Sequence, residues 1–309
     1  MRIYILSRNE NLYSTKRLVQ EATAKGWEVK VIDYLKCTIE IMKGELLVNY
    51  EGKLLPIPDA IIPRIGASKT FYGAAMVRHF EMQDVFSTTG NLALTRSRDK
   101  LRSLQVLSKN DVDLPRTVFA SNKSNAKDVI ALSGGAPLVL KILEGTQGVG
   151  VVLVDSKKAA KSVLDAFYGM DVNLLVQEYI EEANGTDIRA FIVDNEVVGA
   201  MKRQGAEGDF RSNLHQGGSA VAYKLSRKEK ATAIAAARAM GLGVCGVDMI
   251  PSKRGPLVME VNSSPGLEGI EKSTNINIAQ KIMDYIEKNI KPKSSNTQKR
   301  KIKKDNIGA

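Results

Sequence analysis

The chain has 309 residues, of which 43% are hydrophobic and 26% are charged, a composition that fits about two globular domains and excludes wholesale disorder. No apolar run reaches the ~18 residues of a membrane span, the N-terminal apolar run is too short for a signal peptide, and two cysteines cannot build a disulfide framework. We therefore expect a soluble, cytoplasmic protein. The net charge of +11 suggests a polyanionic partner unless it is confined to one segment.

The first 95 residues are predicted to form one small α/β unit. Short apolar runs at 3–6 and 29–32 flank a helical pattern at 12–24, and this β-α-β order favours a flavodoxin-like parallel sheet covered by helices. The other elements expected in this unit are a hairpin over 46–55, a strand over 60–63 and a helix over 71–82.

Beyond a helix predicted over 99–109, the chain is richer in strands. Short glycine-bearing turns between consecutive strands imply antiparallel pairing, so 96–290 should form a larger α+β unit. Strands are predicted over 138–142, 151–154, 174–180, 188–193, 196–203, 244–250 and 257–262, and helices over 157–167, 227–240 and 276–289. A literal GxGxxG at 241–246 follows a helix and opens a strand, so we interpret it as a helix end and not as a dinucleotide site.

Lys141 lies in the apolar strand 138–142, where a lysine is seldom buried without an anionic partner. Gly145, Gly148 and Gly150 follow it, and the backbone N–H groups of such a loop can converge on phosphate oxygens. The segment therefore indicates a phosphate site. The alternative is a glycine hairpin with Lys141 at the edge of a sheet.

The last two predicted strands flank a turn centred near Arg254, and an antiparallel hairpin with this centre places Asp248 opposite Glu260. Because side chains alternate along a strand, Asn262 shares the face of Glu260, and Gly246 lies opposite Asn262. Two acids that face each other repel unless a cation lies between them. Three converging oxygen-bearing side chains predict a site for Mg²⁺ or Mn²⁺, which prefer oxygen ligands, and not for zinc.

The segment 207–218 is polar and glycine-rich, and its composition suggests a site loop more than a plain connector. It contains Arg211, which could pair with phosphate or carboxylate oxygens. An ordinary surface loop has the same composition, so this segment alone does not establish a site.

Together, these segments resemble the ATP-grasp ligases from about residue 94 to 289, and within that superfamily the RimK-type ribosomal-protein glutamate ligases. Several separate motifs in the right order are more specific than any one of them. The motifs are Lys141 before the glycine loop, Gln177-Glu178-Tyr179-Ile180, Asp187-Ile188-Arg189, Arg211-Ser212-Asn213, Asp248 and Glu260-Val261-Asn262, together with the stretches 63–66, 70–73, 98–103, 144–148, 207–215 and 264–272.

The resemblance implies a pre-ATP-grasp domain over 1–95 and an ATP-grasp catalytic domain over 96–290 that holds ATP between two α+β subdomains. It implies that Lys141 and Arg211 are catalytic. It implies that Asp248, Glu260 and Asn262 hold two Mg²⁺ or Mn²⁺ ions. The implied nucleotide-binding residues are Lys100, Lys141, Gly145, Gly148, Gln177, Glu178, Tyr179, Asp187, Arg211, Ser212 and Asn213. The candidates for binding substrate carboxylates are Arg64, Arg189, Lys202 and Arg203, and the alternative for each is an ordinary surface charge.

The activity implied by the resemblance is ATP-dependent addition of glutamate to the C-terminus of a small-subunit ribosomal protein, by a homo-oligomer, with ADP and phosphate as products. Phosphorylation of a carboxylate gives an acyl phosphate with a good leaving group, which an amine then attacks. Metal ions and basic side chains stabilise the transferring group, so no nucleophilic Ser or Cys is needed. A ligase that acts on a small molecule or a carrier protein is an alternative with the same fold.

Residues 291–309 contain seven Lys or Arg and one Asp, so this tail carries +6 of the total charge. Its composition predicts disorder. It could bind RNA, the ribosome or an acidic protein surface, or only aid solubility; no membrane partner is expected. A non-catalytic RNA- or ribosome-binding protein is therefore the alternative of another class, but such a protein gives no reason for Asp248, Glu260 and Asn262.

Overall fold

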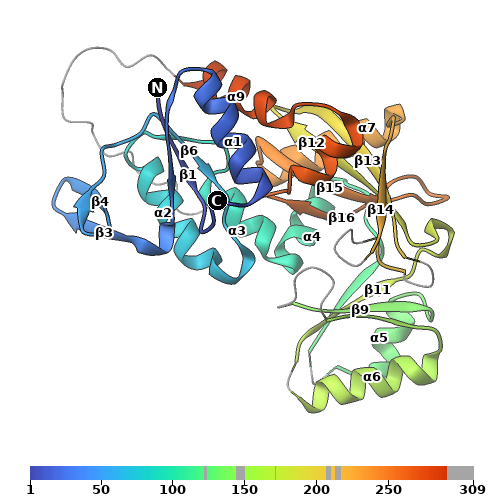
Figure 1. Ribbon diagram of the computed structural model, residues 1–309. Coiled ribbons are helices and arrows are strands. Elements are labelled where there is room, and N and C mark those ends of the chain that lie inside the picture. Colours follow the sequence, from blue (N-terminus) through green and yellow to red (C-terminus); the bar gives the residue numbers. More distant parts are fainter. Residues whose placement is uncertain (122–123, 144–149, 171, 207–209, 213–216, 291–309) are drawn as a thin grey trace.

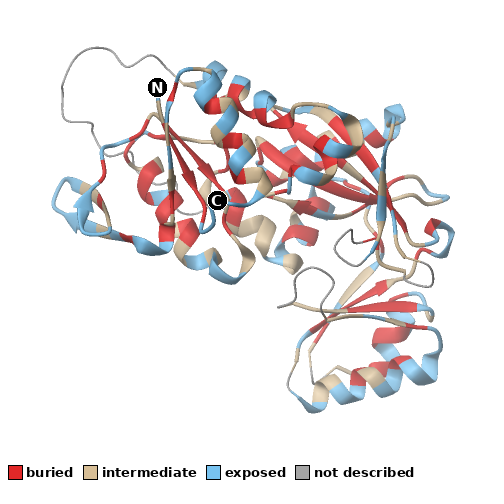
Figure 2. Ribbon diagram, viewed as in Figure 1, coloured by how far each residue is buried: buried red, intermediate tan, exposed pale blue. Residues whose placement is uncertain are grey.

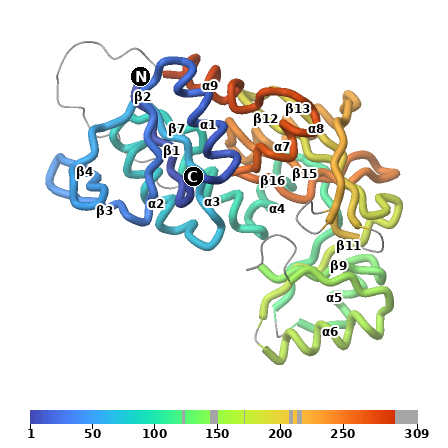
Figure 3. The backbone as a smooth tube through the Cα atoms, in the orientation of Figure 1, coloured from blue at the N-terminus to red at the C-terminus, as the bar shows by residue number. Residues whose placement is uncertain are grey.

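The computed structural model describes residues 1–121, 124–143, 150–170, 172–206, 210–212 and 217–290. Figures 1 and 3 show an N-terminal α/β unit, a small sheet with two helices, and a larger sheet that also receives the end of the described chain. In Figure 2, buried residues run along the strands of all three parts and along the helix sides that face them. Within these ranges, no helix is long and apolar enough to cross a membrane. The basic tail lies outside them.

The N-terminal unit contains a parallel sheet, as predicted, with the strand order β2-β1-β6-β7. Its elements are β1 (Arg2–Leu6), α1 (Tyr13–Ala24), β2 (Glu28–Ile32), η1 (Tyr34–Lys36), β6 (Ala60–Pro63), η2 (Ala67–Lys69), α2 (Thr70–Glu81) and β7 (Phe86–Ser87). Ile3 and Ile5 of β1 pack toward α1, whereas Tyr4 and Leu6 pack toward α2. Because helices cover both faces, the central strands are buried and mostly apolar from Ile3 to Leu6 and along all of β6.

A small antiparallel sheet of β3 (Cys37–Met42), β4 (Glu45–Tyr50) and β5 (Lys53–Leu54) projects from this unit. The predicted hairpin is confirmed as β4 and β5, whose turn residues Glu51 and Gly52 both have positive φ. β3 is not among the predicted strands, although Cys37, Ile39 and Ile41 alternate with polar residues as a half-buried strand does.

The second part is an antiparallel sheet with the order β10-β9-β11-β8 and two helices on one face. Its elements are β8 (Thr117–Ala120), α5 (Ala126–Leu132), β9 (Leu138–Ile142), β10 (Val151–Val154), α6 (Lys157–Gly169) and β11 (Leu174–Glu178). Leu138 and Leu140 pack against the helices. Since side chains alternate, Val139 and Lys141 point to the opposite face of the sheet.

The third part is an antiparallel sheet with the order β14-β13-β12-β15-β16. Its elements are η3 (Glu181–Ala183), β12 (Thr186–Val193), β13 (Glu196–Gln204), β14 (Ser219–Ala222), α7 (Arg227–Met240), β15 (Val244–Ile250), β16 (Leu257–Asn262), α8 (Glu268–Thr274) and α9 (Ile278–Asn289). α7 packs on one face of the sheet, and α8 and α9 pack on the other. One hydrophobic cluster contains Leu18 of α1 and Ile282 of α9, so the N-terminal unit and this sheet share a core.

Helix ends in this region follow local signals. α3 (Asn91–Arg98) leads into α4 (Lys100–Lys109), which begins at Lys100 because the side chain of Asp99 accepts the Arg102 N–H at 2.9 Å. α7 ends at Gly241, whose φ of +71° suits glycine, and β15 begins shortly afterwards. The interpretation of the glycines at 241–246 as a helix end is therefore confirmed.

Candidate active site

The hairpin of β15 and β16 brings together the three side chains that the sequence predicts as metal ligands. Asp248 pairs with Glu260 and Gly246 pairs with Asn262, so the predicted register is confirmed. The Asn262 amide donates to Oε1 of Glu260 at 2.8 Å and to Oδ2 of Asp248 at 3.4 Å. A Cβ atom at position 246 would lie 3.1 Å from the Cβ of Pro265, so glycine suits this close approach.

Asp248 is buried and is held by arginines from two neighbouring strands. Arg189 of β12 donates from Nε to Oδ1 at 2.6 Å and from Nη2 to Oδ2 at 2.5 Å, and Arg203 of β13 lies 3.0 Å from Oδ2. Arg203 also forms a bidentate ion pair with Asp187. Burial alone would raise the pKa of Asp248, but Arg189 and Arg203 outweigh burial and lower it to about 2. Arginine therefore supplies part of the positive charge that the facing acids require.

The donor set of the hairpin fits a hard divalent cation. Mg²⁺ and Mn²⁺ take carboxylate and amide oxygens, and rotation of the Asn262 amide by half a turn exchanges its nitrogen for its oxygen. Glu260 is exposed and accessible to such an ion. In the ranges that the structure describes, no group of three or more His, Cys, Asp or Glu forms a metal site. Substrate phosphates and water are among the ligands that could complete the coordination of such an ion.

Two lysines interact with this hairpin from other elements. Lys141, on the face of the small sheet opposite its helices, donates from Nζ to Oε1 of Gln177 at 2.7 Å. Lys100, the first residue of α4, donates from Nζ to the carbonyl oxygen of Ile142 at 2.9 Å. Burial lowers the pKa of Lys141 to about 8, Glu260 acts to raise it and Lys100 acts to lower it, so these charges interact. The ammonium groups of Lys100 and Lys141 can attract phosphate oxygens, and the carboxylate of Glu260 can attract a divalent cation that the phosphates carry.

The lowered pKa of Lys141 predicts a pH-dependent affinity for nucleotide. The ammonium form, which attracts phosphate, is the main form at neutral pH and gives way to the neutral amine above about pH 8. We expect the dissociation constant for ADP, measured by calorimetry, to rise about tenfold between pH 7 and pH 9. The Lys141→Met variant should bind ADP weakly, with a dissociation constant that does not change between pH 7 and pH 9. The variant Lys158→Met, which replaces an exposed lysine, should show the same pH dependence as the wild type. A wild-type affinity that stays constant over this range would contradict the role of Lys141.

The segment predicted to bind the base of the nucleotide runs from β11 into the chain before η3. Gln177 is buried and donates from Nε2 to Oγ1 of Thr117 at 2.8 Å, which fixes the amide oxygen that Lys141 contacts. Glu178 accepts the backbone N–H of Arg116 at 2.6 Å and forms an ion pair with Arg254. Arg254, at the tip of the β15–β16 turn, therefore joins the two sheets, a contact for which the local sequence gives no signal.

Two further predicted nucleotide residues, Tyr179 and Arg211, contact Phe210. The ring of Tyr179 contacts the ring of Phe210 edge to face with centroids 6.4 Å apart, and the guanidinium of Arg211 lies 5.8 Å from the same ring. Ser212 hydrogen-bonds the buried carboxylate of Asp187, which Arg203 also holds. Asp187 thus binds protein groups within the sheet. The predicted residues Gly145, Gly148 and Asn213 lie outside the described residues.

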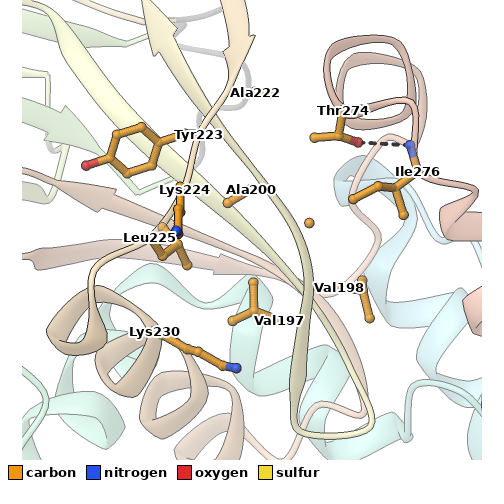
Figure 4. A pocket seen from close by; sticks show the side chains of 11 residues that line it. Val197, Val198, Ala200, Ala222, Tyr223, Lys224, Leu225, Lys230, Thr274 and Ile276 are labelled. Carbon is orange, nitrogen blue, oxygen red and sulfur yellow. Dashed lines mark hydrogen bonds between the residues drawn. The ribbon is translucent and has the colours of Figure 1, made fainter.

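A separate cavity of about 540 Å³ lies between β13, the segment after β14 and the residues that join α8 to α9. Figure 4 shows Val197, Val198 and Ile276 on its wall, together with Lys224 and Lys230. None of the residues that the sequence predicts to bind nucleotide or metal lines this cavity. We therefore assign it no part in the chemistry of the hairpin.

Comparisons with known proteins agree with this arrangement. The family model described as RimK PreATP-grasp domain matches residues 1–94, and the model described as RimK-like ATP-grasp domain matches residues 97–286. A protein of Vibrio vulnificus (strain YJ016), named probable alpha-L-glutamate ligase, is 60% identical over 300 residues, which cover 97% of this chain and 100% of that protein.

Solved structures share the fold at lower sequence identity. The ATP-grasp ligase PsnB, complexed with its minimal precursor, gives a TM-score of 0.73 at 18% identity over 93% of this chain and 97% of that chain. The RimK domain protein ATP-grasp from Sphaerobacter thermophilus DSM 20745 gives a TM-score of 0.66 at 19% identity over 93% and 99%. The predicted fold class, a parallel-sheet domain followed by an ATP-grasp fold, is therefore confirmed.

Proposed function

Because the chain belongs to the RimK-like ATP-grasp family, we propose that it uses ATP to join the amino group of glutamate to a carboxylate of a second substrate. The observation that carries the proposal is the β15–β16 hairpin, whose Glu260 interacts with Lys100 and Lys141 from other elements. ATP phosphates with a divalent cation are a ligand that balances this distribution of charge. The name of the Vibrio relative supports glutamate as the amine.

The proposed reaction is an amide synthesis in two steps. The substrate carboxylate attacks the γ-phosphorus of ATP, ADP leaves, and an acyl phosphate forms. The amino group of glutamate then attacks the acyl carbon, phosphate leaves, and the amine loses a proton as the amide forms. The transferring phosphoryl group spreads negative charge over its oxygens, so fixed positive groups stabilise it without a protein nucleophile.

Each predicted residue has a proposed role in this reaction. Lys141 and Arg211 stabilise the transferring phosphoryl group. Asp248, Glu260 and Asn262 hold two Mg²⁺ or Mn²⁺ ions, which neutralise phosphate charge when bound. The residues proposed to bind the nucleotide are Lys100, Lys141, Gly145, Gly148, Gln177, Glu178, Tyr179, Asp187, Arg211, Ser212 and Asn213. Gln177 has the further task of orienting Lys141, with which it shares a hydrogen bond.

The proposed acceptor is the C-terminal carboxyl of a small-subunit ribosomal protein. The motifs shared with RimK-type ligases support this choice, and we further propose that the protein is a cytoplasmic homo-oligomer. We propose that residues 1–95 form the pre-ATP-grasp domain, 96–290 the catalytic domain and 291–309 a separate basic tail. The tail is the proposed contact with the ribosome or another acidic surface, because of its charge of +6.

The proposal is tested by incubating the full chain with ATP, Mg²⁺ and glutamate, with and without small-subunit ribosomal proteins. We expect ADP release to require glutamate and an acceptor, and mass spectrometry to show glutamyl residues on the C-terminal peptide of the acceptor. A panel of small carboxylates and carrier proteins separates this activity from that of a small-molecule ligase. Absence of ADP and of every adduct would contradict the ligase proposal.

A chain truncated after Asn289 tests the alternative function through the tail. We expect the truncated chain to retain ligase activity on a short acceptor peptide, because the proposed site lies within the large and small sheets. Binding to ribosomes or RNA should weaken, and more so at low salt, where electrostatic attraction is strongest. If binding to ribosomes and RNA is unchanged after truncation, the tail does not contact them.

A further inference from the structure

Two arginines beside the carboxyl end of the N-terminal sheet lack an ion-pair partner. Arg64 directly follows β6, and Arg98 is the last residue of α3. Within the described ranges, neither guanidinium forms an ion pair, and Nε of Arg98 is buried without a hydrogen-bond partner. Burial and the neighbouring positive charge of Arg98 together lower the pKa of Arg64 to about 10, so the two guanidinium groups repel each other. Partly buried cations of this kind are costly unless an anion joins them.

This pair of arginines lies next to the candidate metal site. The chain that leaves β16 passes the end of β6, where Oγ of Ser264 donates to the carbonyl oxygen of Pro63 at 3.4 Å. The neighbouring Ser263 is buried, and its Oγ has no hydrogen-bond partner among the residues that the structure describes. Burial lowers the pKa of Arg98 while Glu260 acts to raise it, so this guanidinium interacts with the acidic hairpin. The unbalanced charge thus adjoins the place where a carboxylate would be activated.

The other basic candidates for substrate carboxylates are engaged or exposed. Arg189 and Arg203 form ion pairs with buried aspartates of the large sheet. Lys202 is exposed to solvent, where an ion pair contributes little. Among these candidates, Arg64 is therefore the partly buried one for which the described chain shows no ion pair, and Arg98 lies beside it in the same condition.

We propose that Arg64, Arg98 and Ser263 bind the carboxylates of the amino acid that supplies the amine, and so select an amino diacid. This inference rests on the proposed function. Glutamate has two carboxylates that do not react, and a guanidinium matches a carboxylate with two parallel N–H donors. A buried hydroxyl can donate one further hydrogen bond. A neutral amino acid would leave a buried cation unpaired, which is the basis of strong discrimination between substrates.

The test compares the KM for glutamate and the KM for ATP in the full-length Arg64→Met variant. We expect the KM for glutamate to rise about 10- to 100-fold, the range for loss of a charge-assisted hydrogen bond, and the KM for ATP to stay within about twofold. The preference for glutamate over glutamine, measured as the ratio of the two kcat/KM values, should also decrease in Arg64→Met. Arg64→Lys, which keeps the charge and loses the paired donors, should fall between wild type and Arg64→Met.

Stability separates this role from a merely structural one. Because methionine removes an unbalanced, partly buried charge, the melting temperature of Arg64→Met should be unchanged or higher without ligand. The exposed Arg78→Gln on α2 is the matched control and should change neither KM nor stability. A lower melting temperature, an unchanged KM for glutamate or a raised KM for ATP would overturn this assignment. Absence of glutamate ligation by the wild type would instead overturn the proposed function.

Discussion

Glu260→Gln should lower ligase turnover by at least about 100-fold while the fold stays intact, since even residues behind metal ligands contribute 10- to 100-fold. Glu260 is exposed, and a glutamine oxygen can keep its hydrogen bond with Asn262. The substitution removes one negative charge from the hairpin and with it affinity for a divalent cation. Release of ADP in the presence of glutamate and acceptor measures the effect.

Two controls isolate the role of Glu260. Glu268→Gln removes an exposed glutamate of α8 that pairs with Lys272, and it should leave turnover unchanged. A higher Mg²⁺ concentration should restore part of the activity of Glu260→Gln, because the loss lies in metal affinity. Full activity of Glu260→Gln at low Mg²⁺ would show that Glu260 is not a metal ligand.

Asp248→Asn should abolish turnover and also lower the free energy of unfolding by about 3 kcal/mol. Asp248 is 2% exposed and pairs with both Arg189 and Arg203. An asparagine of the same shape leaves the guanidinium of Arg189 in the sheet without its carboxylate, whereas Arg203 keeps Asp187. Urea unfolding of the two proteins at neutral pH measures the difference. Equal stability would show that the arginines find other partners.

The stability difference between wild type and Asp248→Asn should depend on pH in a defined direction. The pKa of Asp248 in the folded chain is about 2, below the ordinary value of 3.8, so the ionised carboxylate stabilises the fold above about pH 4. This contribution is lost as the pH falls toward 2, and the difference should shrink there. Asp165→Asn, which removes an exposed ion pair of α6 with Lys161, should cost less than about 1 kcal/mol. A constant difference between pH 6 and pH 3 would contradict the assigned pKa.

Strands with strong patterns are predictable from this sequence, and short exposed elements are not. β6, β9, β10, β15 and β16 have the predicted bounds, because each is a nearly continuous apolar run between turn residues. α5 and α8 have seven residues each, too few for a helical period to stand out. β14 is an edge strand of small, mostly exposed residues, whose pairing with β13 sets its conformation.

The candidate site likewise has features that are predictable from the sequence and features that are not. The two-residue period and a turn near Arg254 predict the pairing of Asp248 with Glu260. In the structure the residues next to the turn pair Met249 with Val258, and a β-bulge between Asp248 and Met249 brings Glu260 opposite Asp248. The ion pair of Asp248 with Arg189 joins residues 59 positions apart, and no local pattern encodes it. Arg64 and Arg98, which form no ion pair within the described part of the chain, likewise become evident only when strands, helices and burial are placed in space.

Binding of Mn²⁺ is the most direct measurement of whether the β15–β16 hairpin is the metal site. Electron paramagnetic resonance of the full chain, titrated with Mn²⁺ beside an unhydrolysable ATP analogue, reports the affinity without turnover. We expect Glu260→Gln and Asn262→Ala to weaken Mn²⁺ binding at least about tenfold relative to wild type and to Glu268→Gln. Equal Mn²⁺ affinity in all four proteins would contradict the assignment of the metal, and with it the proposed activation of a carboxylate at this hairpin.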